Sequence, residues 1–241
     1  GGELGHRAVA GHVVLVVAGF GLFGLGFTGL MCNNINDYKD NFDLKKPNLV
    51  MGGAVGVATA PAETGDPVTN NQKYAFQFGV NINQSTPPFT LQGKILGSSF
   101  FDGATGSRLG TQSQGIYFGT GDQDNYLKLV LHANNGNPGF QILVENNGVV
   151  MSATIYPISN ILSASAIDLF IDINPATGNV QCNYQTNGAL APVNIGPSMT
   201  MTGNLLNVLQ NNNALAVGLI ASAGNMVPFT ASWDYLKVNS S

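Results

Sequence analysis

Short strand-like segments separated by turn-forming residues constrain the fold of this chain more than any other feature. The segment Tyr74–Ile82 alternates cleanly between apolar and polar or small residues, which places its large apolar side chains on one face of a strand. Similar segments follow, as in antiparallel all-β folds, and those between residues 115 and 155 have roughly ten-residue spacing: Gly115–Phe118, Tyr126–Leu131, Phe140–Val144, Val149–Ile155, Ile167–Ile173, Val180–Tyr184, Ala214–Ser222 and Phe229–Val238.

The breaks between these segments have the chemistry of tight turns. Asn146-Asn147-Gly148 predicts a hairpin, because an Asn-Gly pair accepts the positive φ angles that such a turn requires. A second hairpin is predicted around the six residues Asn174–Asn179. Apart from the first 32 residues, only Leu205–Gln210 has a helical pattern. The body is therefore predicted to be all-β, an antiparallel β-sandwich of the jelly-roll type.

Two segments of the body resemble a known family. The run Gln114–Leu129 is similar to the central strands of concanavalin A-like (laminin-G-like) jelly rolls in bacterial surface proteins. The closing run Phe229–Val238 resembles their final strand, and Asp40–Asp43 resembles their usual start. The resemblance covers about residues 40–239 and implies the fold, while the family's functions range from lectins and sugar-binding modules to glycosidases and spacers.

The composition excludes several classes of protein. Only 9% of the 241 residues are charged, with 9 Lys and Arg against 13 Asp and Glu, so no basic surface is available for nucleic acid. With 44% hydrophobic residues the chain can form a core, which argues against disorder. The chain holds 28 asparagines and 31 glycines, and few lysines. We interpret this balance as that of an extracellular or cell-surface protein, and the resemblance suggests a bacterial source.

An apolar segment, Ala8–Met31, precedes the body and contains no Asp, Glu, Lys or Arg. As a helix, its 24 residues would extend roughly 36 Å, enough to cross a bilayer. Four interpretations stay open: a signal peptide, a lipoprotein signal (Leu30-Met31-Cys32 resembles a lipoprotein cleavage box), a membrane anchor, or an assembly element. As an assembly element it would be a pilin-like helix or an extended strand donated to the next subunit.

The assembly interpretation is the favoured one, because so large an apolar surface cannot remain exposed on a monomer. We therefore predict two regions, an assembly or anchor segment at 1–32 and a jelly-roll domain at 33–241. The residues expected to form the intersubunit contact are the large apolar ones of the segment: Val13, Val14, Leu15, Val16, Val17, Phe20, Leu22, Phe23, Leu25 and Phe27.

Catalytic signatures are missing from the sequence. The three glutamates, Glu3, Glu63 and Glu145, lie in unrelated segments, and the paired-carboxylate strand of laminarinase-like jelly rolls is absent. These observations predict that the chain is not an enzyme. A cofactor is not expected, with calcium as the exception: Asp122, Asp124 and Asn125 form a candidate set of hard oxygen ligands, or alternatively an Asx-stabilised turn.

Other candidate residues concern cross-linking and sugar binding. Cys32 and Cys182 are the only cysteines, and are expected either to form a disulfide or to remain as buried thiols. Sugar binding usually requires exposed aromatic rings, for which Tyr117, Tyr126 and Tyr184 are candidates, whereas the single tryptophan, Trp233, is expected in the core.

Three hypotheses for function follow. The first is a secreted, non-enzymatic subunit that polymerises with copies of itself into a filament or surface layer. The second is a carbohydrate-binding or adhesion module that binds surface glycans and is anchored by the apolar segment, which would then contact a membrane. The third is a calcium-dependent adhesin.

Overall fold

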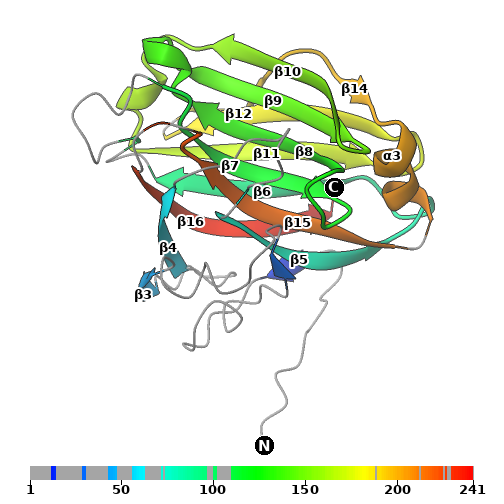
Figure 1. The fold of residues 1–241 in the computed structure, drawn as a ribbon. Helices are drawn as coiled ribbons and strands as arrows, with labels where there is room; N and C mark the ends of the chain where they lie inside the picture. Colours follow the sequence, from blue (N-terminus) through cyan, green and yellow to red (C-terminus); the bar gives the residue numbers. More distant parts are fainter. Residues whose placement is uncertain are drawn as a thin grey trace, which may run out of the picture.

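Two antiparallel sheets pack face to face in the computed structural model of the chain (Figure 1). The structure describes residues 12–14, 29–30, 43–47, 56–62, 72, 74–96, 100–101, 110–187, 189–211, 213–224, 226 and 229–240. Within these residues, both sheets form a sandwich that carries one α-helix, α3 (Gly203–Gln210), at one end. This architecture confirms the predicted fold class, an antiparallel jelly-roll sandwich.

The first sheet, called sheet A, contains the strands that carry the candidate site. They are β1 (His12–Val14), β3 (Asp43–Pro47), β4 (Gly56–Ala62), β6 (Phe89–Leu96), β11 (Ala166–Asn174), β12 (Asn179–Thr186), β13 (Val193–Asn194), β14 (Met199–Thr200) and β16 (Phe229–Ser240). The strand order is β13-β12-β11-β6-β16-β4-β3, with β1 paired to β16 and β14 to β12.

The second sheet, called sheet B, has the order β10-β9-β8-β7-β15-β5-β2. Its strands are β2 (Gly29–Leu30), β5 (Tyr74–Ile82), β7 (Ser113–Gly119), β8 (Tyr126–His132), β9 (Gly139–Asn146), β10 (Val149–Pro157) and β15 (Asn213–Ser222). Short 3-10 helices lie at η1 (Asn134–Gly136) and η2 (Ile161–Ser163).

The core lies between the sheets and follows the alternation of each strand. Along β11, the residues Ile167, Leu169, Ile171 and Ile173 are all at most 1% exposed, while the residues between them are partly exposed. Trp233 of β16 is 1% exposed, and its indole N–H donates to the carbonyl oxygen of Gly115 on β7, 3.0 Å away. Trp233 therefore lies in the core, as the sequence predicted, and its hydrogen bond joins the two sheets.

Turn chemistry explains the hairpins. Asn147 and Gly148 have φ angles of 54° and 71°, and connect β9 to β10 where Asn146 faces Val149. Gly178, with φ at 71°, lies in the connection between Asn174 and Asn179, which face each other on β11 and β12. Both hairpin predictions are confirmed. The predicted helical segment 205–210 lies within α3.

The structure describes two short stretches of the apolar segment Ala8–Met31, called the apolar head below. β1 pairs with β16, where Val13 faces Val238, and β2 pairs with β5, where Leu30 faces Phe76. Val13 and Val14 thus belong to a strand that pairs with another strand of the same chain. The other eight predicted assembly residues lie outside the described residues. Among the helices that the structure describes, none is long and apolar enough to cross a bilayer. The separation into regions 1–32 and 33–241 stays a prediction.

Candidate functional site

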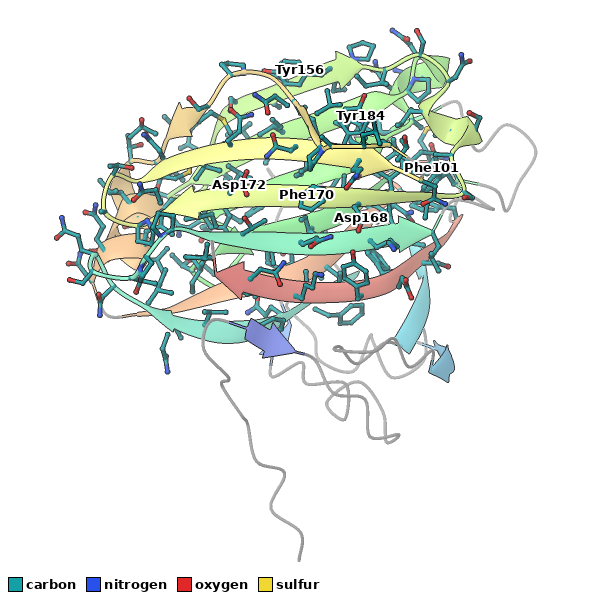
Figure 2. All side chains as sticks on the ribbon, turned by 180° about the vertical axis from the view of Figure 1, so that it is seen from behind. Phe101, Tyr156, Asp168, Phe170, Asp172 and Tyr184 are labelled. Atoms are coloured by element: carbon teal, nitrogen blue, oxygen red, sulfur yellow. The ribbon has the colours of Figure 1, made fainter. Side chains whose placement is uncertain are left out.

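An aromatic side chain, Phe170, lies on the outer face of sheet A. It occupies the middle of β11, where its neighbours Leu169 and Ile171 point into the core and are 0% exposed. By the period-2 geometry of a strand, Phe170 points to the opposite side and is partly exposed. Asp168 and Asp172 stand two positions to either side on the same face, as Figure 2 shows along the strand.

Polar side chains of the adjacent strands flank this ring. Phe170 is opposite Gln92 on β6 and opposite Asn183 on β12. The ring is therefore bounded by two carboxylates along its own strand and by two amides across the neighbouring strands. We call the set Phe170, Gln92, Asp168, Asp172, Asn183 and Tyr235 the Phe170 platform.

Hydrogen bonds hold both carboxylates of the platform in place. Asp172 accepts one from the Thr90 hydroxyl and one from the Asn183 amide nitrogen, the latter at 2.7 Å. Asp168 accepts hydrogen bonds from the Gln92 amide nitrogen, at 3.1 Å, and from the Tyr235 hydroxyl. Side chains fixed in this way lose little conformational entropy when they bind a ligand.

Tyr235 reaches the outer face because of a β-bulge in β16. The register against β6 shifts between Trp233 and Tyr235, so two residues that would share a face in a regular strand point to opposite sides. The Tyr235 hydroxyl accepts from Gln92 at 2.7 Å, and the ammonium groups of Lys94 and Lys237 lie 5.1 and 5.0 Å from its ring centroid. Burial, followed by the hydrogen bond to Asp168, raises the pKa of Tyr235, which keeps this hydroxyl protonated.

The charges on this face nearly balance. The Lys94 ammonium lies 3.9 Å from carboxylate oxygens of both Asp168 and Asp234. Burial is the largest cause of a lowered pKa at Lys237. The platform therefore offers an aromatic ring and directional hydrogen-bonding groups with little excess charge. This arrangement suits a ligand that has an apolar face and several hydroxyl groups.

Sequence reasoning missed this site, although a signal for it was present. In the alternating segment Ile167–Ile173, Phe170 shares one face of the strand with Asp168 and Asp172. A large apolar ring thus stands where the pattern predicts a polar residue. Strand β6, which supplies Gln92 and Lys94, was not predicted, even though its residues also alternate between buried and partly exposed. Of the three candidate tyrosines, Tyr117 and Tyr126 are 0% and 3% exposed, and only Tyr184 is partly exposed.

The predicted calcium ligands lie together in the turn between β7 and β8. Asp122 accepts hydrogen bonds from the Asp124 backbone N–H at 2.9 Å and from the Asn125 amide at 3.2 Å, which is an Asx-type turn. The side-chain oxygen of Asn125 accepts from the Asn147 backbone N–H at 2.7 Å and from the Asn204 amide at 2.9 Å. These oxygens thus already have protein partners. No group of three or more His, Cys, Asp or Glu side chains that could hold a metal occurs within the described residues.

We expect the turn to be stable without calcium, because its carboxylate and amide oxygens are bonded to the protein itself. An excess of EDTA should leave the thermal midpoint unchanged. Asn125→Ala should cost about 1–3 kcal/mol, since Asn125 is 6% exposed and two donors lose their acceptor. Thermal unfolding measures both effects, with exposed Asn194→Ala as the matched control. A midpoint that falls with EDTA and recovers with calcium would contradict this expectation.

Cys182 lies in the core on β12 and is 0% exposed. Burial, together with the charge of Asp172, raises the pKa of its thiol, which favours the unreactive protonated form. Cys32 lies outside the described residues, so the disulfide between them stays a prediction.

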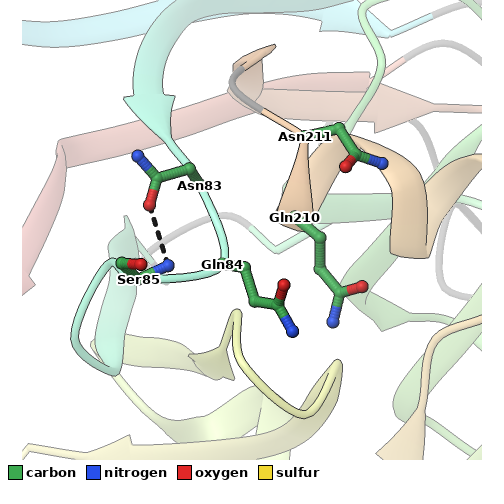
Figure 3. A pocket seen from close by; sticks show the side chains of 5 residues that line it. All are labelled: Asn83, Gln84, Ser85, Gln210 and Asn211. Carbon is green, nitrogen blue, oxygen red and sulfur yellow. Dashed lines mark hydrogen bonds between the residues drawn. The ribbon is translucent and has the colours of Figure 1, made fainter.

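A pocket of about 400 Å³ lies where the β5–β6 connection meets the end of α3 (Figure 3). Its lining consists of Asn83, Gln84, Ser85, Gln210 and Asn211. The Ser85 backbone N–H donates to the Asn83 side-chain oxygen at 2.8 Å, and the Gln210 amide donates to the carbonyl oxygens of Pro175 and Ala176. The described lining has no aromatic ring, so this pocket lacks the stacking surface of the Phe170 platform.

Comparisons with known proteins give matches in structure alone. No protein-family model matches the chain, and no curated protein sequence does. Solved structures do match, at low sequence identity. Xyloglucan PUL GH43B of Bacteroides ovatus is 13% identical with a TM-score of 0.53, covering 88% of this chain and 37% of that one. A GH43 protein, BlXynB, from Bacillus licheniformis is 13% identical with a TM-score of 0.56, covering 84% of this chain and 40% of that one. The xylan beta-1,4-xylosidase of Bacillus halodurans is 13% identical with a TM-score of 0.53, covering 83% and 39%.

These matches correct one prediction. The chain was expected not to be an enzyme, and the similarity to GH43 glycoside hydrolases contradicts that expectation. The expectation rested on the scattered glutamates and on the absence of familiar catalytic motifs, and such motifs do not represent every active site that a sandwich fold can carry.

The share of each matched chain that is covered differs between the glycoside hydrolases and the lectins. This chain spans about two fifths of the length of the glycoside hydrolase chains that it matches. Lectins match over nearly their whole length, for example the Bauhinia forficata lectin in complex with GalNAc, at 9% identity and a TM-score of 0.49 with 87% of this chain and 94% of that chain covered. At these identities what is shared is the fold: the chain is a β-sandwich of the jelly-roll class.

Proposed function

We propose that this chain is a carbohydrate-binding module and that the Phe170 platform is its binding face. The observation that carries the proposal is the position of Phe170, a partly exposed ring on the outer face of sheet A, bounded by Asp168, Asp172, Gln92 and Asn183. A pyranose has an apolar face that stacks on an aromatic ring, and its hydroxyl groups extend sideways towards such acceptors and donors.

The chemistry of the platform favours a neutral ligand. Asp168 and Asp172 are engaged by amide and hydroxyl donors that hold them in one orientation, and carboxylates accept strong hydrogen bonds from sugar hydroxyls. The near balance of charge on this face leaves no excess of positive charge to attract a phosphate or sulfate group. The names of the matched solved structures support the ligand class, because xyloglucan and xylan are both polysaccharides and the fold occurs in those proteins.

We also propose that the module works outside the cell or at its surface, as the low charge and the high asparagine content suggest. Polymerisation through the apolar head has weaker support than carbohydrate binding. The described part of the head, including Val13 and Val14, pairs with strands of its own chain. Assembly with other copies therefore stays a prediction.

Replacing Phe170 with alanine should weaken glycan binding at least about tenfold, as for a central aromatic contact of a binding site. Phe170→Leu should lose a similar amount, because it keeps an apolar side chain but no ring. The measurement is a glycan array followed by titration of the oligosaccharides that bind. Met151→Ala is the matched control, since Met151 is an apolar side chain on sheet B that is 61% exposed. If the folded wild type binds nothing on the array, or if Phe170→Ala binds as tightly as the wild type, the proposal fails.

A further inference from the structure

A second concave site lies at the end of the sandwich, away from the Phe170 platform. It has a volume of about 460 Å³, within the range of small-molecule pockets. The connection from β10 to β11, including η2, forms one wall, and the end of β12 forms the other. Tyr184 of β12, labelled in Figure 2, lines this pocket, and its partner across the strands is Leu169, which points into the core. The pocket is therefore on the inner side of sheet A, whereas Phe170 is on the outer side.

The described lining of this pocket carries no ionisable carboxylate, ammonium or imidazole. Its polar groups are hydroxyls and amides, including Ser159, Asn160, Thr186 and Asn187. Apolar surface comes from Ile158 and Ile161 and from the Tyr184 ring. A charged ligand would give up part of its hydration here without gaining a counter-ion from the described lining. The pocket therefore favours an uncharged molecule with both hydroxyl groups and an apolar surface.

Hydrogen bonds of the fold hold the backbone of Asn160 and the side chain of Asn187 in position at the pocket. Asn160 adopts the left-handed conformation, with φ at 61°, and its carbonyl oxygen accepts hydrogen bonds from the Ser163 hydroxyl at 2.7 Å and from the Ser163 backbone N–H at 3.0 Å. The exposed Asn160 side chain makes no capping bond to η2, so its amide is available to a ligand. Asn187 donates to the Ser165 hydroxyl on the facing wall. Tyr184 packs on Phe140, with ring centroids 4.6 Å apart.

We infer that this pocket binds a single uncharged sugar unit, or the end of a glycan chain, at a site separate from the Phe170 platform. The inference takes its ligand class from the proposed function but uses different residues on the other side of sheet A. A platform binds the middle of a chain from one side, whereas a pocket of about 460 Å³ has room for one unit. The two sites would let the module contact both an internal part and an end of a glycan.

Two substitutions test the pocket without disturbing the core. Asn160→Gly removes the amide while keeping the positive φ, which glycine adopts without strain. Thr186→Val removes a hydroxyl at nearly constant shape. The matched control is Asn147→Gly, because Asn147 also has a positive φ, at 54°, but lies in the β9–β10 hairpin and does not line the pocket. Phe170→Ala separates the pocket from the platform.

Binding is measured by NMR titration of each variant with neutral hexoses and pentoses, and with glucuronate as the charged probe. We expect saturable binding of at least one neutral sugar, weakened about three- to tenfold by Asn160→Gly and by Thr186→Val, as for one lost hydrogen bond. Asn147→Gly should bind as the wild type does. Phe170→Ala should lose only the shift changes on the outer face of sheet A and keep those of the pocket residues Ser159, Asn160 and Asn187. The inference is overturned if no neutral sugar binds, if the two pocket variants bind like the wild type, or if glucuronate binds equally well. Loss of array binding in Phe170→Ala tests the proposed function and leaves this result unaffected.

Discussion

Replacing Trp233 with alanine is expected to lower the free energy of unfolding by about 3–5 kcal/mol, the usual cost of deleting a buried aromatic side chain. Trp233 is 1% exposed, and its loss would leave a cavity between the sheets. It would also leave the Gly115 carbonyl oxygen without its indole donor, which lies 3.0 Å away. The bulge that turns Tyr235 outwards begins at this residue, so the platform should lose its geometry together with the core.

Trp233→Phe is the control for this prediction. It keeps an aromatic ring and loses mainly the hydrogen bond, so a smaller loss of about 1–2 kcal/mol is expected. Because the chain has one tryptophan, denaturant unfolding must be followed by circular dichroism and not by tryptophan fluorescence. A loss below about 1 kcal/mol in Trp233→Ala would show that Trp233 does not join the two sheets.

Glu145→Gln is expected to stabilise the protein at pH 8 and to have little effect at pH 4.5. Glu145 is 0% exposed, and neither of its carboxylate oxygens accepts a hydrogen bond of good geometry. Burial is the main cause that raises its pKa from 4.5 to about 7, and Asp124 adds to the shift, while the nearby Tyr126 and Lys128 side chains oppose it. Glutamine has the same shape and carries no charge at any pH.

The direction of the pH effect follows from the two pKa values of Glu145. Below pH 4.5 both the folded and the unfolded chain hold the proton, so the group contributes nothing to the pH dependence. Between pH 4.5 and 7 the unfolded chain releases the proton first, so stability falls as the pH rises. Above pH 7 the charged Glu145 lowers the free energy of unfolding by its full amount, at most about 3 kcal/mol at 1.36 kcal/mol per pH unit.

The measurement is urea unfolding of the wild type and of Glu145→Gln at pH 4.5, 6 and 8. The difference between the two proteins should grow with pH towards about 3 kcal/mol. Comparing them at each pH isolates Glu145 from His132, whose pKa is lowered to about 4, mainly by burial, and whose contribution is lost as the pH falls from 6.5. Asp124→Asn should shift the transition to lower pH. A difference that does not change with pH would contradict the raised pKa.

Local patterns in the sequence predict most of the sandwich. The strand at 74–82 has the predicted bounds, and the Asn147-Gly148 hairpin and the helical segment at 205–210 were both predicted, because alternation and turn chemistry are properties of neighbouring residues. Tyr117 could not be placed by the same means. Its side chain points away from the core between the two sheets, yet it is 0% exposed. The alternation along β7 therefore did not determine whether this side chain reaches solvent.

The candidate site depends on contacts between distant segments, and the sequence does not show these. Gln92 and Phe170 become neighbours only because β6 pairs with β11, and Tyr235 joins them from the far end of the chain. The bulge after Trp233 also reverses the side to which Tyr235 points, which simple alternation predicts wrongly. Even so, Phe170 stands between Asp168 and Asp172 at positions where the alternation predicts polar residues, and this local pattern identifies it.

The most direct test of carbohydrate binding at the Phe170 platform is an NMR titration of the wild-type protein with the oligosaccharides that bind best on the array. We predict that the largest chemical-shift changes occur on the outer face of sheet A, at Gln92, Phe170 and Asn183 and in the side chain of Tyr235. These changes should be absent from Phe170→Ala. Shift changes confined to sheet B, or no saturable change with any oligosaccharide, would contradict the account.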